Sequence, residues 1–349
     1  MGRSVARFSV AHPDAGARLA SYACACVLVL AALVGGTSCG AMAGWEVRDG
    51  GEAGGRAAEA PGDLGGFSVY VSRSGRHGRD FPLRGVPVVR DDVRMLYEHQ
   101  IGMYPRIWKG EVAYGGTPVG LDLVAHTRKL REDIDRLVPD AQFDGILVFD
   151  YESRGLYWDR LGEAYKEIVR SRIRSVRSGI DAEELETLSE EAYDTATRRY
   201  MEVTIGLVRS MRPRAKLAKY WFPRATSTVE RSGWLADLLD VMIAHMYPFH
   251  YSVSGVRPGK GQASIDRFVS RNLAEMEAAK RFAAGEKPVL GFVRPVYHEV
   301  NGGYAHRVIN DLDARAITLS PEEEGLDGLI FWLHAYNPEE AADIEEGMQ

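Results

Sequence analysis

The sequence predicts an α/β protein whose main domain is a distorted, TIM-like (β/α) barrel with seven strands. Short apolar segments rich in β-branched and aromatic residues alternate with longer amphipathic segments, and this alternation is typical of βαβ units in a parallel sheet. The seven strand segments spread over about 280 residues, which suits a closed barrel of roughly 250 residues. An open, doubly wound sheet is the alternative, but no G-x-G-x-x-G motif follows the first strand segment, so nothing supports a dinucleotide site.

The predicted elements follow one another from residue 66 to residue 345, which we expect to be the barrel domain. We expect strands at residues 67–71, 93–98, 145–152, 215–222, 240–247, 288–293 and 327–334. We expect helices at residues 121–138, 182–211, 263–283 and 304–317. The preceding residues 44–65 are rich in Gly, Ala and charged residues with few core-forming side chains, which indicates a flexible linker.

Residues 1–43 have the pattern of an export signal. The segment Leu19–Val34 is apolar and uncharged and follows several arginines, as in a signal peptide, and it is short for a membrane span of roughly 20 residues. Two endings compete: Ala41-Met42-Ala43 fits a cleavage site, whereas Gly36-Thr37-Ser38-Cys39 resembles a bacterial lipoprotein box. An uncleaved anchor helix is a third interpretation. The expected location is extracellular, periplasmic or at the membrane through a lipid on Cys39.

Composition and motifs exclude several function classes. The formal net charge of −6 argues against nucleic-acid binding. There is no P-loop, no H-E-x-x-H and no paired cysteine motif, and the histidines lack metal-ligand spacing. The three cysteines all lie within the first 39 residues, so the predicted barrel holds no nucleophilic cysteine. We therefore expect neither a metal nor a cofactor.

The third predicted strand, GILVFDYE, ends in two carboxylates. Residues two apart in a strand point the same way, so Asp150 and Glu152 share one face with Val148, some 6–7 Å apart at Cα, while Phe149 and Tyr151 share the other. Barrel active sites lie at the C-terminal ends of strands. Two carboxylates in an apolar cup cannot both ionise easily, and glycoside hydrolysis is the reaction that most commonly uses such a pair. The alternative is that both carboxylates cap the next helix and pair with Arg154 or Arg160.

Aromatic and hydroxyl-bearing residues end several other predicted strands. They are Tyr220 and Trp221, Tyr247 and Trp332, and a further strand segment ends at the cation Arg294 with Tyr297 nearby. Sugar rings present apolar CH faces and hydroxyl edges, and such side chains suit both.

Ordered segments of the chain resemble the hyaluronidase family, endo-β-N-acetylhexosaminidases with a seven-stranded (β/α) barrel. The segments are IGMYPRI (101–107), VAYGG and LDLVAHTRKLREDI (112–134), FDGILVFDYESRGLYW (143–158), RSMRPRAKLAKYWFP (209–223), VLGFVRPVY (289–297) and GLDGLIFWL (325–333). The triplet D-Y-E corresponds to D-W-E in the family.

The resemblance implies a role for each residue that matches. Glu152 is the expected general acid and base, and Asp150 orients the substrate's acetamido group. Tyr220 and Tyr247 correspond to two tyrosines of the family site, and Trp332 to the tryptophan that closes its floor. Tyr151, Trp221, Arg294 and Tyr297 are further expected substrate contacts. The implied mechanism is substrate-assisted and retaining, with the acetamido carbonyl as nucleophile.

Departures from the family pattern suggest a distant relative of bacterial type. The family's F-P-D-C segment is here Phe222-Pro223-Arg224-Ala225, and Tyr151 replaces a Trp. The expected substrate is a glycosaminoglycan-like polysaccharide such as hyaluronan, and cationic contacts to it are sought among Arg106, Arg154, Arg224 and Arg294. Two alternatives remain: a barrel that binds glycan without catalysis at the cell surface, and a chitinase-like hydrolase, whose D-x-x-D-x-D-x-E spacing the chain matches less well.

Overall fold

The computed structural model describes residues 67–74, 89–247, 262–297 and 321–334. The expected export signal, the linker and the helix at 304–317 lie outside these residues. The chain divides into two compact units. Among the described residues, the smaller comprises Pro105–Asp122 and Gly155–Thr197, and the larger comprises all the others.

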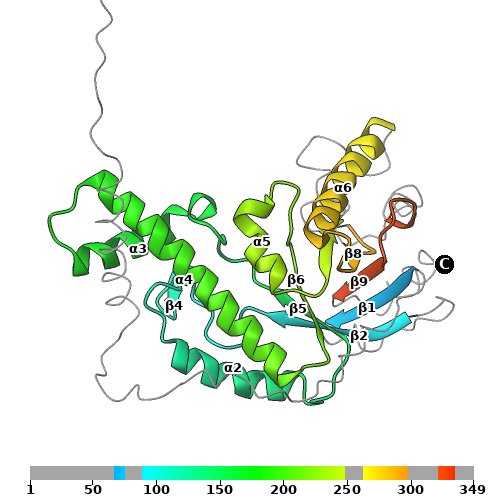
Figure 1. The fold of residues 1–349 in the computed structure, drawn as a ribbon, viewed down its shortest axis with the longest axis horizontal. Coiled ribbons are helices and arrows are strands. Elements are labelled where there is room, and N and C mark those ends of the chain that lie inside the picture. Colours follow the sequence, from blue (N-terminus) through cyan, green and yellow to red (C-terminus); the bar gives the residue numbers. More distant parts are fainter. Residues whose placement is uncertain (1–66, 75–88, 248–261, 298–320, 335–349) are drawn as a thin grey trace, which may run out of the picture. The chain divides into compact units, whose positions relative to one another are not determined.

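The larger unit contains a sheet of seven parallel strands in the order β6-β5-β2-β1-β9-β8-β7 (Figure 1). The strands are β1 (Ser68–Ser74), β2 (Val89–Tyr97), β5 (Ile146–Asp150), β6 (Lys216–Lys219), β7 (Met242–His245), β8 (Val289–Val293) and β9 (Gly328–His334). All seven predicted strands are confirmed. Each overlaps the segment from which it was predicted, although β5, β6 and β7 end two to three residues earlier than expected. A strand covered on both faces needs a largely hydrophobic sequence.

The two edge strands of the sheet approach each other, which gives it the shape of a nearly closed barrel. Just before β7, the backbone N–H of Asp240 donates to the carbonyl of Leu217 in β6 at 2.8 Å. The Asp240 carboxylate accepts the backbone N–H of Leu217 at 2.8 Å in return. One aspartate thereby connects β6 to the start of β7, and the predicted barrel fold is confirmed.

Alternate residues of the strands fill the barrel interior. The inward cluster includes Val93, Val148, Ile243, Phe292 and Ile330, each 1% exposed or less. Partly buried aromatic rings, among them Trp221 and Trp332, pack against it. The same alternation turns the opposite face of each strand away from the barrel interior.

Helices of the larger unit include α2 (Leu123–Leu137), α5 (Val229–Asp237) and α6 (Gln262–Ala283). The helix α4 (Ala182–Met211) divides, with residues 182–197 in the smaller unit and 198–211 in the larger. His126 of α2 is fully buried: its Nδ1 accepts the N–H of Met103 at 3.0 Å and its Nε2 lies 2.9 Å from Oγ1 of Thr204. Burial lowers the pKa of His126 to about 4, so this histidine is a neutral core residue.

The smaller unit has a hairpin and helices of its own. Strands β3 (Arg106–Trp108) and β4 (Glu111–Ala113) pair antiparallel around Lys109 and Gly110, which both have positive φ, as a two-residue hairpin turn requires. A short 3-10 helix, η1 (Trp158–Arg160), precedes α3 (Glu163–Val176). The hairpin, η1, α3 and α5 were not among the predicted elements.

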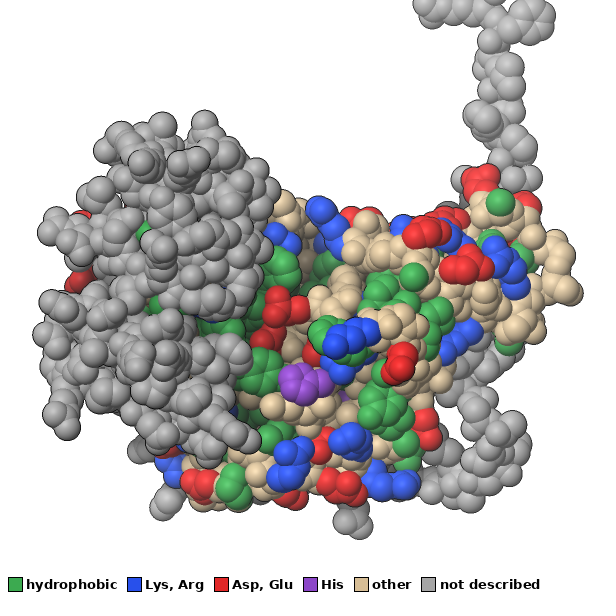
Figure 2. All heavy atoms as spheres, turned by 180° about the vertical axis from the view of Figure 1, so that it is seen from behind, with side chains coloured by type: hydrophobic (Ala, Val, Ile, Leu, Met, Phe, Trp, Pro, Cys, Tyr) green, Lys and Arg blue, Asp and Glu red, His purple; other side chains and the backbone are tan. Residues whose placement is uncertain are grey.

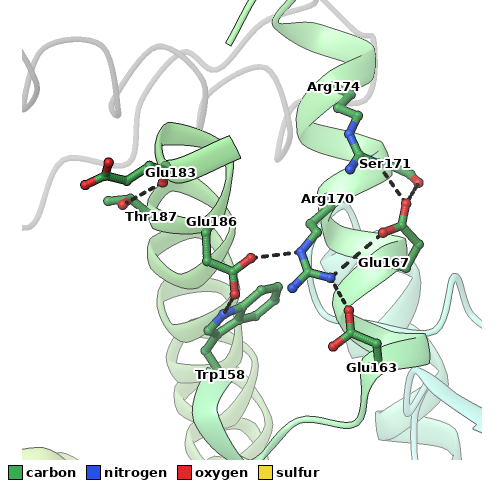
Figure 3. A network of polar contacts seen from close by, with 9 residues as sticks. All are labelled: Trp158, Glu163, Glu167, Arg170, Ser171, Arg174, Glu183, Glu186 and Thr187. Atoms are coloured by element: carbon green, nitrogen blue, oxygen red, sulfur yellow. Dashed lines mark hydrogen bonds and ion pairs between the residues drawn. The ribbon is translucent and has the colours of Figure 1, made fainter. Parts of the chain in front are cut away.

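A polar network joins η1, α3 and the first half of α4 (Figure 3). Nε of Arg170 donates to Glu186 at 2.8 Å, and the other oxygen of that carboxylate accepts the indole N–H of Trp158, also at 2.8 Å. Arg170 also donates to Glu163 and lies over the ring of Trp158. Arg170 is mostly shielded from solvent, whereas Glu163 and Glu186 are exposed, so these contacts connect the three elements but contribute only modestly to stability.

Candidate active site

The D-Y-E triplet lies where β5 leaves the barrel. Ile146 and Val148 point into the core cluster, and Asp150 and Glu152 continue that face beyond it. Tyr151 lies on the other side, only 4% exposed, with its ring 4.7 Å from that of Tyr104. The predicted division of the strand into two faces is thus what the structure shows. It also leaves Tyr151 packed in an aromatic cluster outside the barrel interior, so its side chain does not lie with the other candidate site residues.

The backbone of this turn is held by a residue that sequence reasoning missed, Glu98, which follows β2. Its N–H donates to the carbonyl of Asp150 at 3.1 Å. One of its carboxylate oxygens accepts the N–H groups of Glu152 and Ser153, each at 3.0 Å. Hydrogen bonds to a charged acceptor are stronger than neutral ones, so Glu98 fixes the peptide units that carry the Glu152 side chain.

The two carboxyl groups share a raised affinity for protons. Burial raises the pKa of Asp150 to about 8, with further contributions from the charge of Glu152 and a hydrogen bond with it. Glu152 is exposed as a residue and Asp150 is half-buried. Partial desolvation of the Glu152 carboxylate still raises its pKa, although the hydrogen bond with Asp150 and the positive charge of Lys219 oppose the rise. The sequence predicted like-charge repulsion as the cause, whereas burial contributes more. Such a pair holds one proton near neutral pH.

Aromatic rings from β6, β7 and β9 lie together in the same barrel interior. The hydroxyl of Tyr220, just after β6, lies 2.8 Å from Nε2 of His245, which is fully buried in β7. The rings of Tyr247 and Trp332 stack with centroids 5.8 Å apart and planes 16° from parallel. Tyr220 and Tyr247 are close as well, with ring centroids 5.9 Å apart. Burial and the two carboxylates raise the pKa of Tyr220 well above its usual value, which keeps its hydroxyl protonated and able to donate.

The remaining predicted binding residues divide by exposure. Arg294 is 2% exposed, with its guanidinium 5.3 Å from the Trp332 ring centroid, and Tyr297 is 2% exposed. Both side chains are therefore buried rather than open to a ligand at the surface. Trp221 is partly exposed and adopts a positive φ of 60°, an uncommon conformation for a bulky residue that occurs preferentially at functional sites. The exposed Arg224 lies over its ring at 4.4 Å.

Two of the four arginines considered as cationic contacts have other surroundings. Arg154 is 7% exposed with its guanidinium over the rings of Tyr104 and Tyr200. Arg106 lies in the smaller unit, over Trp108. Arg224 therefore remains as the exposed cation beside a predicted sugar-binding ring.

The purely structural interpretation of Asp150 and Glu152 finds no support in the described residues. Neither carboxylate forms an ion pair with Arg154 or Arg160 there, and Arg160 pairs with Asp159 at 3.6 Å. The helix that follows, α3, has Gly162 at its N-cap position without a side-chain cap.

The described surface fits the composition. Acidic and basic side chains are interspersed with hydrophobic ones on the face in Figure 2. The described residues hold no group of three or more His, Cys, Asp or Glu side chains placed to bind a metal ion. Among the helices that the structure describes, none is both long and apolar enough to cross a membrane.

Comparisons with known proteins agree with this site. The hyaluronidase family profile matches residues 85–232, a range that includes Asp150, Glu152 and Tyr220. Human hyaluronidase-1 is 29% identical over 261 residues, which cover 65% of this chain and 58% of the relative. The hyaluronidase of Crotalus adamanteus is 23% identical over 263 residues, covering 69% of this chain and 57% of the relative. The resemblance to the hyaluronidase family is confirmed, and the chain spans less than three fifths of the length of these relatives.

Solved structures show the same fold. Bee venom hyaluronidase superposes with a TM-score of 0.64 at 18% identity, covering 80% of this chain and 96% of the other. Its complex with a hyaluronic acid tetramer gives a TM-score of 0.63 at 19% identity, covering 76% and 90%. At this identity the likeness establishes the barrel and leaves the chemistry to the residues.

Proposed function

We propose that this relative of the hyaluronidases is a glycoside hydrolase that cleaves a hyaluronan-like polysaccharide as an endo-β-N-acetylhexosaminidase. The observation that carries the proposal is the Asp150–Glu152 pair at the end of a barrel strand, where both carboxyls have a raised pKa and their charges act on the buried hydroxyl of Tyr220. A protonated carboxyl near neutral pH is what a general acid requires. The hyaluronic acid tetramer bound by the bee venom protein supports the choice of substrate.

The proposed reaction is substrate-assisted and retaining. The carbonyl oxygen of the 2-acetamido group attacks the anomeric carbon while Glu152 gives its proton to the leaving glycosidic oxygen, so one C–O bond forms as the other breaks. Asp150 accepts the acetamido N–H and balances the positive charge of the resulting oxazolinium. Water then attacks the same carbon, Glu152 takes its proton, and the ring opens with retained configuration.

The high proton affinity of Asp150 fits this sequence of steps. In the free protein the raised pKa of Asp150 and its hydrogen bond with Glu152 favour one proton shared by the pair. A bound acetamido N–H needs a carboxylate acceptor at Asp150, so substrate binding favours transfer of the proton to Glu152, where the leaving oxygen requires it. The protonated hydroxyl of Tyr220 donates a hydrogen bond to the developing oxazolinium oxygen, and Tyr247 lies beside it.

The test is release of reducing ends from hyaluronan, chondroitin, chitin oligomers and peptidoglycan strands, with the products identified by mass. Glu152→Gln keeps the size of the side chain and removes its acid function, so it should lower turnover by about 1,000-fold or more while the protein still folds. Glu202→Gln, on the outer surface of α4 in an ion pair with Arg198, is the matched control. Full activity in Glu152→Gln would contradict the proposal, and binding without turnover by the natural sequence would favour a glycan-binding barrel.

We further propose that residues 1–43 export the barrel domain of residues 66–345 over a linker at 44–65. The apolar segment Leu19–Val34 and the small residues after it support this proposal. The mass of the mature N-terminus distinguishes a diacylated Cys39 from cleavage after Ala43. A mature chain that keeps Met1 would favour the third interpretation, an uncleaved anchor helix.

A further inference from the structure

A lysine is buried directly behind the carboxylate pair. Lys219 is the last residue of β6 and only 3% exposed. Its neighbours Ala218 and Tyr220 belong to the barrel interior, so the lysine points to the opposite side of the strand, which parallel barrels fill with apolar side chains. Burying an ammonium there costs several kcal/mol unless charges and hydrogen bonds compensate.

The hydrogen bonds of Lys219 connect the two strand ends that carry the candidate catalytic residues. Its Nζ donates to the carbonyl of Tyr151 at 3.2 Å and to the carbonyl of Tyr220 at 3.0 Å. Tyr151 is the residue between Asp150 and Glu152, and its carbonyl belongs to the peptide group that leads into Glu152. One ammonium thus fixes the carboxylate turn to the end of β6, while Glu98 fixes the same turn from the side of β2.

The charges around Lys219 are mainly negative. Asp150, Glu152 and Glu98 attract its ammonium, and Arg154 repels it. Within the described residues Lys219 forms no direct ion pair with Asp150 or Glu152, so its charge acts on them from behind the strand. Burial lowers the pKa of Lys219 to about 8, and the three carboxylates limit that fall.

We propose that Lys219 is a positioning residue of this site, whose ammonium both fixes the Asp150–Tyr151–Glu152 turn and limits how strongly the carboxylate pair holds its protons. The proposal deepens the proposed function and rests on it for its catalytic consequence. The ammonium lowers the pKa of both Asp150 and Glu152, which supports the second part. A lysine with a purely structural role would donate to the two carbonyls without changing the pH at which Asp150 and Glu152 titrate.

The experiment follows the carboxyl groups directly, without substrate. The full chain is labelled with ¹³C at the side-chain carboxyls, and the signals are assigned by their loss in Asp150→Asn and Glu152→Gln. In Lys219→Met the titration of the pair should move to higher pH by roughly one unit, as expected for loss of a nearby opposite charge. Lys219→Gln, which keeps a donor without the charge, should show the same shift, and Lys219→Arg, which keeps the charge, should restore most of the original midpoint.

The matched control is Lys287, which also donates from Nζ to two backbone carbonyls, those of Ala236 at 2.7 Å and Leu239 at 2.9 Å. Lys287→Met loses the same kind of hydrogen bonds before the start of β8 and should leave the titration of Asp150 and Glu152 unchanged. An unmoved titration in both Lys219→Met and Lys219→Gln, or an equal shift in Lys287→Met, would overturn the proposal. If Lys219→Met does not fold, the comparison of Lys219→Gln with Lys219→Arg decides.

Turnover gives an independent second measurement. With Lys219→Gln, the basic limb of the kcat/KM profile should move to higher pH together with the carboxyl titration. If the natural sequence cleaves none of the four glycans, the proposed hydrolase function fails, whereas the ¹³C titration still decides the role of Lys219. If the glycan is cleaved and the titration does not move, only the proposal for Lys219 fails.

Discussion

The hydroxyl of Tyr220 lies 2.8 Å from Nε2 of His245, and both side chains are buried in the barrel interior. This hydrogen bond links Tyr220, which we propose contacts the substrate, to a histidine that the sequence did not single out. It fixes the direction of the phenol, because the ring of His245 also packs against Tyr247 with centroids 4.6 Å apart. His245 therefore contacts both Tyr220 and Tyr247 and holds the two rings in place.

The contribution of this contact to turnover can be measured with a double-mutant cycle. His245→Phe and Tyr220→Phe each remove the hydrogen bond, and each should lower kcat by about 10-fold or more and destabilise the fold by roughly 1–2 kcal/mol. Because both variants break the same contact, the double variant should cost clearly less than the sum of the two. Strict additivity in kcat would mean that His245 does not act through Tyr220.

The raised pKa of Asp150 gives a stability prediction with a definite sign. A carboxyl whose folded pKa of about 8 exceeds its unfolded value of roughly 3.9 stabilises the fold at low pH, and that contribution is lost as pH rises towards 8. The side chain in Asp150→Asn cannot ionise, so the variant avoids this loss. Its free energy of unfolding minus that of the natural sequence should therefore increase from pH 5 to pH 8, by on the order of 2 kcal/mol. Urea unfolding at several pH values measures this difference.

Asp133 supplies a control of opposite sign for the same substitution. Burial raises its pKa, but hydrogen bonds from Lys129, Arg136 and the N–H of Gly102 outweigh burial and leave the pKa lowered. Asp133→Asn should therefore be less stable than the natural sequence at neutral pH. The difference between their free energies of unfolding should become smaller as pH falls through the folded pKa of Asp133. If Asp150→Asn and Asp133→Asn changed with pH in the same direction, the assigned protonation of the Asp150–Glu152 pair would be wrong.

Two glycines test how tightly the barrel strands are packed. A Cβ at Gly145, at the start of β5, would lie 2.0 Å from the backbone oxygen of Asp92, so Gly145→Ala should destabilise the fold by about 1–3 kcal/mol. Gly206 lies in α4 with nothing within 4 Å of such a Cβ. Gly206→Ala should raise stability by about 0.5–1 kcal/mol, because alanine favours the helix. A neutral Gly145→Ala in thermal or urea unfolding would contradict the packing of β5 against β2.

The sequence predicted the strands because short segments rich in apolar and β-branched residues, such as ILVFD in β5 and VLGFV in β8, alternate with longer helical patterns. The face shared by Val148, Asp150 and Glu152 followed from the strand period alone. Strand order could not be predicted in this way, since it depends on which runs pair in space. β2 and β6 lie on either side of β5, and only this order brings Glu98 and Lys219 next to the carboxylate pair.

Other differences have local causes. Lys219 is polar but buried, because a parallel barrel covers both strand faces, and hydrophobic patterning does not identify a lysine whose partners are backbone carbonyls. The helix α5 was missed because it is only nine residues long and has Gly233 in its middle, which lowers its helix propensity. Tyr151 was grouped with the substrate contacts through the family's D-W-E triplet, whereas its position in the strand turns it towards Tyr104 and Tyr200.

Arg224 provides the test for the charge of the substrate. It is exposed beside Trp221, with its guanidinium 4.4 Å from the ring centroid, so an anionic sugar stacked near this tryptophan would meet a cation. Arg224→Met should weaken binding of hyaluronan oligosaccharides by about 3- to 10-fold, as expected for an exposed charge contact, and should reduce the dependence of binding on salt. Binding of neutral chitin oligomers should not change.

Arg214→Met is the control, because Arg214 is an exposed arginine paired with Asp144 at 3.3 Å before β6 begins. Equal losses for hyaluronan and chitin would show that Arg224 acts through the shape of the Trp221 site, and the preference for an anionic polymer would then have to come from another residue.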